Sequence, residues 1–208
     1  MQKFQLPKVY PITDARLSGL SHAAQTEKLI EGGARLIQLR EKYAAPAEFY
    51  AEAERALKIA RQSEAKILIN DRVDLALVLE ADGVHLGQND LPVAEARKIL
   101  GDRAIIGFST HSVEQAIAAL KEPIDYIAIG AIFPTSTKEK PEAILGLENL
   151  RRVRDAIGDF PLVAIGGITG GNARSCFEAG ADSVAVISEL LRDAKTISEK
   201  MRAMSEIK

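Results

Sequence analysis

The sequence has few of the residues that mark several protein classes. It contains no tryptophan, a single cysteine among 208 residues, and only 5% aromatic side chains. One cysteine cannot form an intramolecular disulfide, and no Cys/His cluster has the spacing of a zinc site. The scarcity of aromatic rings disfavours a stacking surface for single-stranded nucleic acid. These absences exclude a disulfide-stapled scaffold and argue against a nucleic-acid-binding module.

An excess of charge of one sign and long hydrophobic runs are missing as well. Lys and Arg total 27 against 29 Asp and Glu, which gives a net charge of −2 and no basic excess for nucleic acid. No apolar stretch is long enough to span a membrane, and residues 1–10 lack the hydrophobic run of a signal peptide. We therefore expect a cytoplasmic protein with no nucleic-acid or membrane partner.

The residues that are present predict a single folded domain. Hydrophobic residues make up 47% of the chain, which is enough for a large core. A chain of this length usually forms one domain, and no linker rich in Pro, Gly or Ser divides it. We therefore expect residues 1–208 to form one domain.

Eight short apolar runs alternate with helical patterns from one end of the chain to the other. They lie at residues 9–14, 36–39, 67–69, 83–87, 104–109, 126–132, 162–165 and 183–187. Their richness in Ile, Val and Leu is typical of strands buried on both faces. Strands joined through helices run parallel, and eight such strand–helix units can close into a barrel. The pattern predicts an α/β fold, a single (β/α)8 TIM barrel with eight parallel strands. An open doubly wound sheet is the alternative, and the lack of a dinucleotide fingerprint after the first run disfavours it.

Several of the intervening helices have readable ends. Pro46 is placed to begin a helix over residues 46–63, and Pro92 precedes one over 93–100 that Gly101 ends. Ser112 is a suitable N-cap for a helix over 113–121. Further helices are expected at 147–157, at 172–179 and from residue 193 onward.

Polar residues gather where the predicted strands end, which is the active-site face of a parallel barrel. After the second run, Gln38, Arg40 and Lys42 alternate with Leu39 and Glu41, so the two sets point to opposite sides. Leu39 belongs against a helix, which turns the other set toward the barrel axis. Two cations there repel each other and are costly to desolvate unless an anion joins them. The segment favours an external anion, with internal carboxylates as the alternative.

Carboxylates follow the next two runs. Asp71 comes directly after Asn70, and Asp90 lies four residues after Leu86. Two carboxylates at adjacent strand ends can hold Mg²⁺ together with phosphate oxygens of a substrate. Taken one at a time, Asp71 could instead cap a helix and Asp90 could shape a turn before Pro92. Beside Arg40 and Lys42, the pair favours a site for a metal and a pyrophosphate.

The later strand ends suggest a second phosphate site. Hydroxyls at Thr135, Ser136 and Thr137 precede Lys138 in the longest polar connection, for which a solvated loop is the alternative. Barrels commonly hold a phosphate at the loops after strands seven and eight. Gly167 there would allow close approach, and Ile187 and Ser188 end the eighth run, although tight turns also use glycine.

Other chemically active residues are assigned structural places. His85 lies inside the fourth run and is expected to be a packed barrel residue, whereas His22 is expected at the surface. His111 follows Ser109 near the barrel mouth, and a catalytic role for it is left open. Cys176 falls in an alanine-rich helix and is expected to be a buried small side chain. No nucleophile–base–orienter triad can be assembled, which fits chemistry that expels pyrophosphate without a protein nucleophile.

Six motifs occur in register with six predicted strand ends. They are residues 38–42, 69–71, 82–88 with Asp90, 107–111, 134–138 and 165–168. Together they resemble the thiamine-phosphate synthase (thiamine-phosphate pyrophosphorylase) family of TIM-barrel enzymes, over nearly the whole chain. The resemblance implies a Mg²⁺-dependent transferase that joins 4-amino-2-methyl-5-hydroxymethylpyrimidine diphosphate to 4-methyl-5-hydroxyethylthiazole phosphate. The products would be thiamine phosphate and pyrophosphate.

The resemblance also implies roles for individual residues. Those around the pyrimidine diphosphate would be Gln38, Leu39, Arg40, Glu41, Lys42, Asn70, Ser109 and Lys138. Asp71 and Asp90 would ligate Mg²⁺, and the thiazole phosphate would be held by Thr135, Ser136, Thr137, Gly167, Ile187 and Ser188. The family mechanism is dissociative, so pyrophosphate leaves before the thiazole nitrogen attacks. Catalytic roles would fall to Arg40, Lys42, Ser109 and Lys138.

Two departures and two alternatives accompany the resemblance. Ala131 stands where the family often has proline, and residues 144–146 replace a segment that often carries glutamine, but neither change removes a charged ligand. A thiazole tautomerase shares the fold, and a non-catalytic protein that binds thiazole phosphate is the second alternative. The tautomerase needs no diphosphate cluster, which argues against it. The expected partners are small phosphorylated substrates, and homo-oligomerisation is left open.

Overall fold

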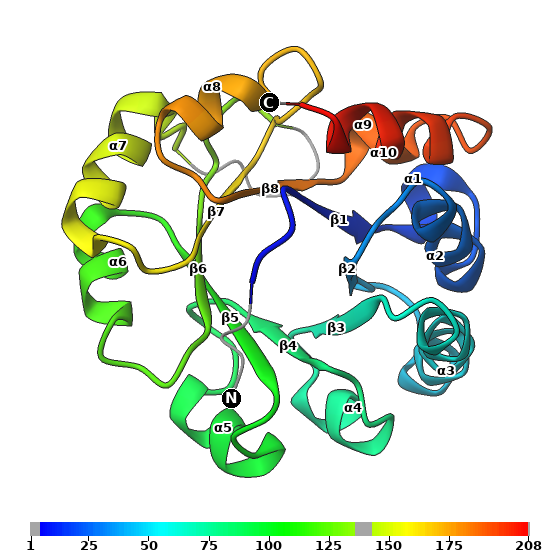
Figure 1. Ribbon diagram of the computed structural model, residues 1–208. Helices are drawn as coiled ribbons and strands as arrows, with labels where there is room; N and C mark the ends of the chain where they lie inside the picture. The colour runs from blue at the N-terminus through cyan, green and yellow to red at the C-terminus, as the bar shows by residue number, and fades with distance from the viewer. Residues whose placement is uncertain (1–4, 136–142, 208) are drawn as a thin grey trace.

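The structure is a computed structural model that describes residues 5–135 and 143–207. Its strands form a closed barrel in the order β1-β2-β3-β4-β5-β6-β7-β8, and every neighbouring pair is parallel (Figure 1). They are β1 (Val9–Thr13), β2 (Leu36–Leu39), β3 (Lys66–Asn70), β4 (Gly83–Leu86), β5 (Ile105–Thr110), β6 (Tyr126–Ile129), β7 (Leu162–Ile165) and β8 (Ser183–Val186). The predicted (β/α)8 barrel is confirmed, and the open sheet is not what forms.

The helices lie outside the barrel and surround it in Figure 1. They are α1 (Ala15–Ser18), α2 (His22–Glu31), α3 (Pro46–Arg61), α4 (Val73–Val78), α5 (Val93–Leu100), α6 (Val113–Ala119), α7 (Gly146–Ile157), α8 (Ala173–Glu178), α9 (Ser188–Leu191) and α10 (Ile197–Ser205). The predicted ends hold where capping chemistry is present. Pro46 begins α3, Gly101 ends α5, and the Ser112 side chain accepts a hydrogen bond from the Gln115 N–H. No helix in the described part of the chain is long and apolar enough to cross a bilayer.

Two apolar layers follow from the alternation of side chains along each strand. One fills the barrel interior, where Tyr10, Leu36, Leu68 and Tyr126 pack against one another. The other lies between strands and helices and includes Leu39, which has no exposed surface. Residues two apart along a strand share a side, so Gln38 points inward with Leu36 while Leu39 points outward. The predicted orientation of this segment is confirmed.

Two expectations about extent need correction. The sixth strand ends at Ile129, three residues earlier than the apolar run, and the Gly130–Ala131 peptide bond is cis. Ala131 and Ile132 are nevertheless buried, because the chain beyond β6 still bonds to β7 through Ile132 N–H to Ile165 O at 2.9 Å. The last helix begins at Ile197 rather than at residue 193.

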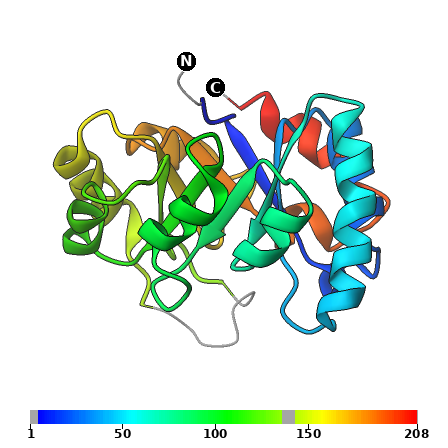
Figure 2. The ribbon, with the colours of Figure 1, turned by 90° about the horizontal axis from the view of Figure 1, so that it is seen from below.

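Both ends of the described chain lie on the same side of the barrel, next to the start of β1 (Figure 2). The opposite rim, where the strands end, is therefore formed by the loops that carry the polar motifs.

Candidate active site

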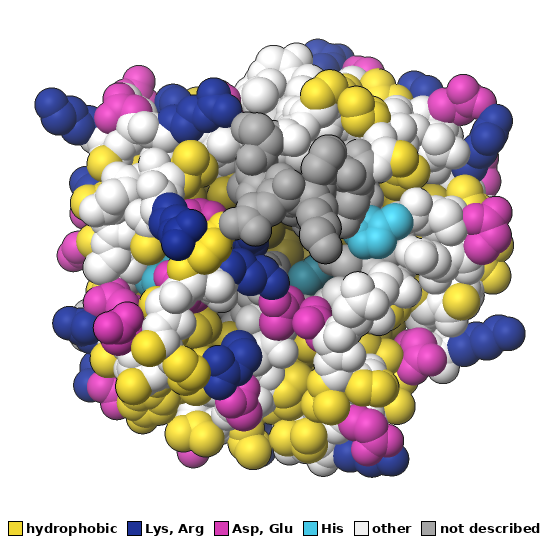
Figure 3. All heavy atoms as spheres, turned by 180° about the vertical axis from the view of Figure 1, so that it is seen from behind, with side chains coloured by type: hydrophobic (Ala, Val, Ile, Leu, Met, Phe, Trp, Pro, Cys, Tyr) yellow, Lys and Arg dark blue, Asp and Glu magenta, His cyan; other side chains and the backbone are white. Residues whose placement is uncertain are grey.

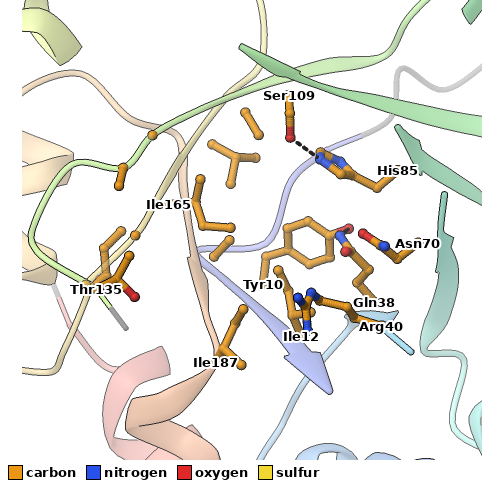
Figure 4. Close-up of a pocket in the computed structure, with 18 of the residues that line it drawn as sticks. Tyr10, Ile12, Gln38, Arg40, Asn70, His85, Ser109, Thr135, Ile165 and Ile187 are labelled. Atoms are coloured by element: carbon orange, nitrogen blue, oxygen red, sulfur yellow. Dashed lines mark hydrogen bonds between the residues drawn. The ribbon is translucent and has the colours of Figure 1, made fainter. Parts of the chain in front are cut away.

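A cavity opens at the carboxyl ends of the strands, and its lining comes from all eight of them (Figure 4). Its floor is apolar, with Ile12, Val163 and Ala185 among the lining residues. The polar side chains that line it are Tyr10, Gln38, Arg40, Asn70, His85, Ser109, Thr110, His111, Thr135 and Ser188. Figure 3 shows basic, acidic and histidine side chains around the hollow on this face. The cavity therefore combines an apolar floor with a polar lining that includes the Arg40 guanidinium.

The two cations predicted at the end of β2 are both paired with internal carboxylates. Arg40 Nη1 lies 2.9 Å from Asp14 Oδ2, at the end of β1, and the pair is mostly buried. Lys42 Nζ pairs with Asp71 Oδ2 at the more exposed rim. The internal neutralisation that the sequence offered as an alternative is thus present, and an external anion at these groups stays a prediction.

Glu41 and His22 form a buried link on the other side of the segment. His22 is 1% exposed, with Nδ1 at 2.7 Å from Thr13 Oγ1 and Nε2 at 3.2 Å from Glu41 Oε2. The expectation that His22 lies at the surface is therefore wrong, because it begins α2 where that helix packs against Phe49 of α3. Burial acts to raise the pKa of Glu41, but backbone N–H groups and His22 outweigh it and lower that pKa. Neither Leu39 nor Glu41 presents its side chain to the cavity.

The two predicted metal ligands lie together. Asp90 has a raised pKa, chiefly because it is partly buried and also because it faces and hydrogen-bonds Asp71, while the Gly87 N–H and Lys42 lower it. Asp90 Oδ2 also accepts a hydrogen bond from the Gly87 N–H at 2.6 Å, so the turn role holds as well. Asp71 caps no helix, since α4 has no side-chain cap.

This donor set fits a hard divalent cation that shares its coordination with substrate and water. Two carboxyl groups held against each other repel when both are ionised, and a cation between them would remove that repulsion. Within residues 5–135 and 143–207, no group of three or more His, Cys, Asp or Glu side chains could hold a metal. The residues therefore fit Mg²⁺, which accepts one or two carboxylates, better than a metal that needs a full protein cage.

Asn70 and Ser109 supply hydrogen-bonding groups between the rim and the floor. Asn70 is 7% exposed, and its Nδ2 has no hydrogen-bond partner within the described residues. Ser109 Oγ lies 2.8 Å from His85 Nε2, the contact drawn as a dashed line in Figure 4. An unpaired buried amide donor is costly, so the Asn70 side chain is suited to a ligand that supplies an acceptor.

The opposite side of the cavity is built from hydroxyls and glycine. Thr135, Gly167 and Ser188 line both the main cavity and a smaller adjoining pocket, which also contains Glu189 and Arg192. Gly167 has φ +65°, and a Cβ there would lie 2.4 Å from Pro134 O, so only glycine fits. Ile187 lines the main cavity as well. Ser136, Thr137 and Lys138 lie outside the described residues.

Sequence reasoning missed Arg192, Tyr10 and Tyr126. Arg192 follows Ser188 by four residues across α9, a helical spacing that places both on one face and was available as a signal. No local signal identified the two tyrosines, because the contacts that matter join strands far apart in the chain.

The remaining candidates have defined surroundings. His111 lines the cavity, and its Nδ1 lies 2.8 Å from the Gly130 carbonyl oxygen. A carbonyl only accepts, so Nδ1 carries the proton in that contact. Cys176 is fully buried, as predicted, and burial raises the pKa of its thiol to about 11. It contributes packing and not a nucleophile.

A family model and several named relatives identify the family of this chain. Residues 9–190 match the family described as thiamine monophosphate synthase. A thiamine-phosphate synthase of Chloroflexus aurantiacus is 40% identical over 203 residues, covering 96% of this chain and 93% of that protein. One from Koribacter versatilis is 45% identical over 198 residues, covering 92% of each chain.

A solved structure, the thiamine phosphate pyrophosphorylase from Pyrococcus furiosus, superposes with a TM-score of 0.85 at 38% identity. The match covers 96% of this chain and 94% of that one. The sequence match, the shared barrel and the identity to named relatives all point the same way. The chain therefore belongs to the thiamine monophosphate synthase family.

Proposed function

We propose that this protein is a thiamine-phosphate synthase, a transferase that couples the pyrimidine diphosphate to the thiazole phosphate and releases pyrophosphate. The names of its relatives support this reaction. The observation that carries it is one cavity with two unlike polar ends. At β2–β4, Arg40 lines the cavity, and the Lys42–Asp71 pair follows at the neighbouring strand ends; a hydroxyl-and-glycine pocket stands at β6–β8.

The cationic end suits the pyrimidine diphosphate. Arg40 and Lys42 supply the positive charge for a diphosphate, with Lys138 proposed to add a third cation from outside the described residues. The unpaired Asn70 Nδ2 is a further donor for a buried acceptor. A bound diphosphate would take over part of the charge that Asp14 and Asp71 now balance.

Asp71 and Asp90 are the residues proposed to hold Mg²⁺. When bound, that ion would neutralise charge on the diphosphate. One cation, Lys42, acts on both Asp71 and Asp90, so a second positive charge is still needed to balance the two carboxylates. Divalent cation binding would thus relieve the repulsion between them.

The chain's own groups can support dissociative chemistry. The bond from the pyrimidine methylene to the diphosphate oxygen breaks, and its electron pair leaves with the pyrophosphate. The thiazole nitrogen then donates its lone pair to the methylene carbon and forms the new C–N bond. Arg40, Lys42 and Lys138 would stabilise the negative charge that develops on the leaving group, more than they stabilise the bound substrate. The apolar floor keeps water from the cation left behind.

The thiazole phosphate is proposed to occupy the other end. Thr135 and Ser188 present hydroxyls, and Gly167 lets the backbone approach the phosphate closely. Ser136 and Thr137, outside the described residues, are proposed to complete this set. Its place across the cavity from Arg40 would bring the thiazole nitrogen toward the pyrimidine methylene.

A turnover assay with both substrates tests the proposal. Thiamine phosphate and pyrophosphate are quantified separately, with Mg²⁺ and with a chelator. We expect equal amounts of both products, dependent on the metal. Turnover of neither substrate, with binding of thiazole phosphate retained, would overturn the proposal and support the non-catalytic binding protein. Isomerisation of a thiazole phosphate without pyrophosphate would support the tautomerase.

A further inference from the structure

A continuous chain of hydrogen bonds crosses the barrel interior and ends at Ser109. Gln38 Nε2 lies 2.8 Å from Tyr10 Oη, which lies 2.9 Å from Tyr126 Oη. Tyr126 Oη lies 2.8 Å from His85 Nδ1, and His85 Nε2 lies 2.8 Å from Ser109 Oγ. Strands β2, β1, β6, β4 and β5 each contribute one member, so the chain exists only because the barrel closes.

The surroundings hold the members in place. Tyr10, Tyr126 and His85 are 1%, 0% and 7% exposed. The two phenol rings meet edge-on, and His85 stacks on Tyr126 at 5.6 Å between ring centres. A Cβ at Gly107 would lie 2.0 Å from Tyr126 Cζ, so the space for this ring depends on a glycine in β5. Side chains packed this closely have little freedom to exchange partners.

The direction of the chain follows from its first member. The Gln38 amide donates to Tyr10 Oη, so the Tyr10 proton needs an acceptor, and Tyr126 Oη is the one within reach among the described residues. Tyr126 then donates to His85 Nδ1, which leaves the ring proton on Nε2 to be donated to Ser109. Burial raises the pKa of both phenols, so both remain protonated donors.

We infer that this one-way chain fixes Ser109 as a hydrogen-bond donor to the ligand, and that Tyr126 and His85 are positioning residues that act through Ser109. Because Ser109 Oγ accepts from His85, its own proton points away from the ring and toward the cavity. In the reverse direction Ser109 would give its proton to His85 and offer the ligand only an acceptor.

The resulting pattern of groups is suited to an aminopyrimidine. Ser109 O–H and Asn70 Nδ2 are donors, and Gln38, whose Nε2 gives one of its two protons to Tyr10, has Oε1 as an acceptor. A pyrimidine with an exocyclic amino group offers ring-nitrogen acceptors and an N–H donor. This assignment of the acceptor rests on the proposed function, whereas the direction of the chain does not.

The tautomer of His85 tests the direction without substrate or turnover. The protein has three histidines in all, so its ¹⁵N-histidine NMR spectrum is simple, and His85→Gln identifies the signals of His85. We expect the neutral Nε2–H tautomer at His85 near neutral pH. His111, whose Nδ1 donates to Gly130 O, serves as the internal reference for the opposite tautomer. An Nδ1–H or doubly protonated ring at His85 overturns the inference, even in an enzyme that proves to be an active synthase.

A double-mutant cycle tests whether Tyr126 acts through Ser109. Tyr126→Phe keeps the ring and removes the link, and we expect kcat/KM for the pyrimidine diphosphate to fall about tenfold, the effect of one buried hydrogen bond. In a Ser109→Ala background the same change should cause no further fall. Tyr50→Phe on α3 removes a hydroxyl that does not belong to the hydrogen-bond chain, and it should leave kcat/KM unchanged.

An equal fall in both backgrounds would assign Tyr126 a purely structural role and overturn the inference. If Tyr126→Phe does not fold, the His85 tautomer in the unchanged protein remains decisive. A protein without synthase activity but with the Nε2–H tautomer would refute the proposed function and leave the chain standing.

Discussion

The two ends of the cavity differ in the kind of group that they offer to a negatively charged ligand. At β2–β4, Arg40 and Lys42 are full charges, and each is already balanced by a carboxylate of the same chain. At β6–β8, Thr135, Gly167 and Ser188 offer dipoles, and the charged residues of the adjoining pocket are Glu189 and Arg192. Under the proposed function, the charged end would respond to a leaving group whose charge increases, whereas the dipolar end would hold a phosphate whose charge stays constant. The difference suggests that the first end serves catalysis and the second serves binding.

The largest effect is expected at the charged end. Arg40→Ala should lower kcat about a hundredfold, because losing one well-placed donor to a developing charge costs about 3 kcal/mol. Steady-state kinetics with both substrates measures this. Arg55→Ala on α3, which removes an exposed arginine paired with Glu52, is the matched control and should change nothing. A change confined to KM would mean that the two ends do not differ as described.

At the dipolar end we expect a binding defect. Gly167→Ala would place a side chain at φ +65° with its Cβ 2.4 Å from Pro134 O. The backbone strain should cost about 1–3 kcal/mol of stability, seen in thermal denaturation. The KM for thiazole phosphate should rise more than kcat falls. Gly170→Ala, where a Cβ meets nothing within 4 Å, is the control that should behave like the unchanged protein.

Arg192 sharpens the comparison because it is the cation among the described residues that line the smaller pocket at the dipolar end, where Glu189 is the carboxylate. It is exposed, so solvent screens it and Arg192→Ala should raise the KM for thiazole phosphate only about twofold to fivefold. The effect should shrink as salt is added, with kcat unchanged. Arg174→Ala on α8 removes an exposed arginine elsewhere and provides the baseline. A hundredfold loss of kcat would place Arg192 with the catalytic groups instead.

The smallest effect is expected in stability without metal. The raised pKa of Asp90 means that its ionised form is disfavoured in the fold, so this carboxyl destabilises the protein once the pH exceeds that pKa. Asp90→Asn should therefore raise Tm at pH 7 in a chelator, and the gain should disappear as the pH falls and Asp90 becomes protonated. Adding Mg²⁺ should stabilise the unchanged protein more than the variant. A lower Tm for the variant at pH 7 would contradict the repulsion between Asp71 and Asp90.

The sequence predicted the parts of this molecule that depend on local chemistry. Strands appeared as short runs of branched apolar residues, and alternation alone placed Gln38 and Arg40 on the cavity side and Leu39 against the helices. Ser112 and Gly101 marked helix ends because caps act within a turn. The positions of Asp71 and Asp90 after adjacent parallel strands were enough to bring them together.

The features that sequence reasoning missed depend on distant contacts. Arg40 pairs with Asp14 across 26 positions, and Tyr10 meets Tyr126 across 116. His22 was expected at the surface, but it is buried, and its burial depends on how α2 packs on the barrel. Such pairings follow from closure of the barrel, which no local window contains.

Gly107 and Tyr126 have a consequence for how this barrel can change over evolution. Any side chain at position 107 would occupy the space of the Tyr126 ring, so neither position can vary alone while the hydrogen-bond chain is kept. Relatives that replace this glycine should also carry a smaller residue at the position of Tyr126. Such proteins would lack the phenol that donates to His85. The serine at the position of Ser109 could then accept from, as well as donate to, the ring of a substrate. The presence of both Gly107 and Tyr126 in a sequence therefore predicts which members of the family have the hydrogen-bond chain that we infer to orient Ser109.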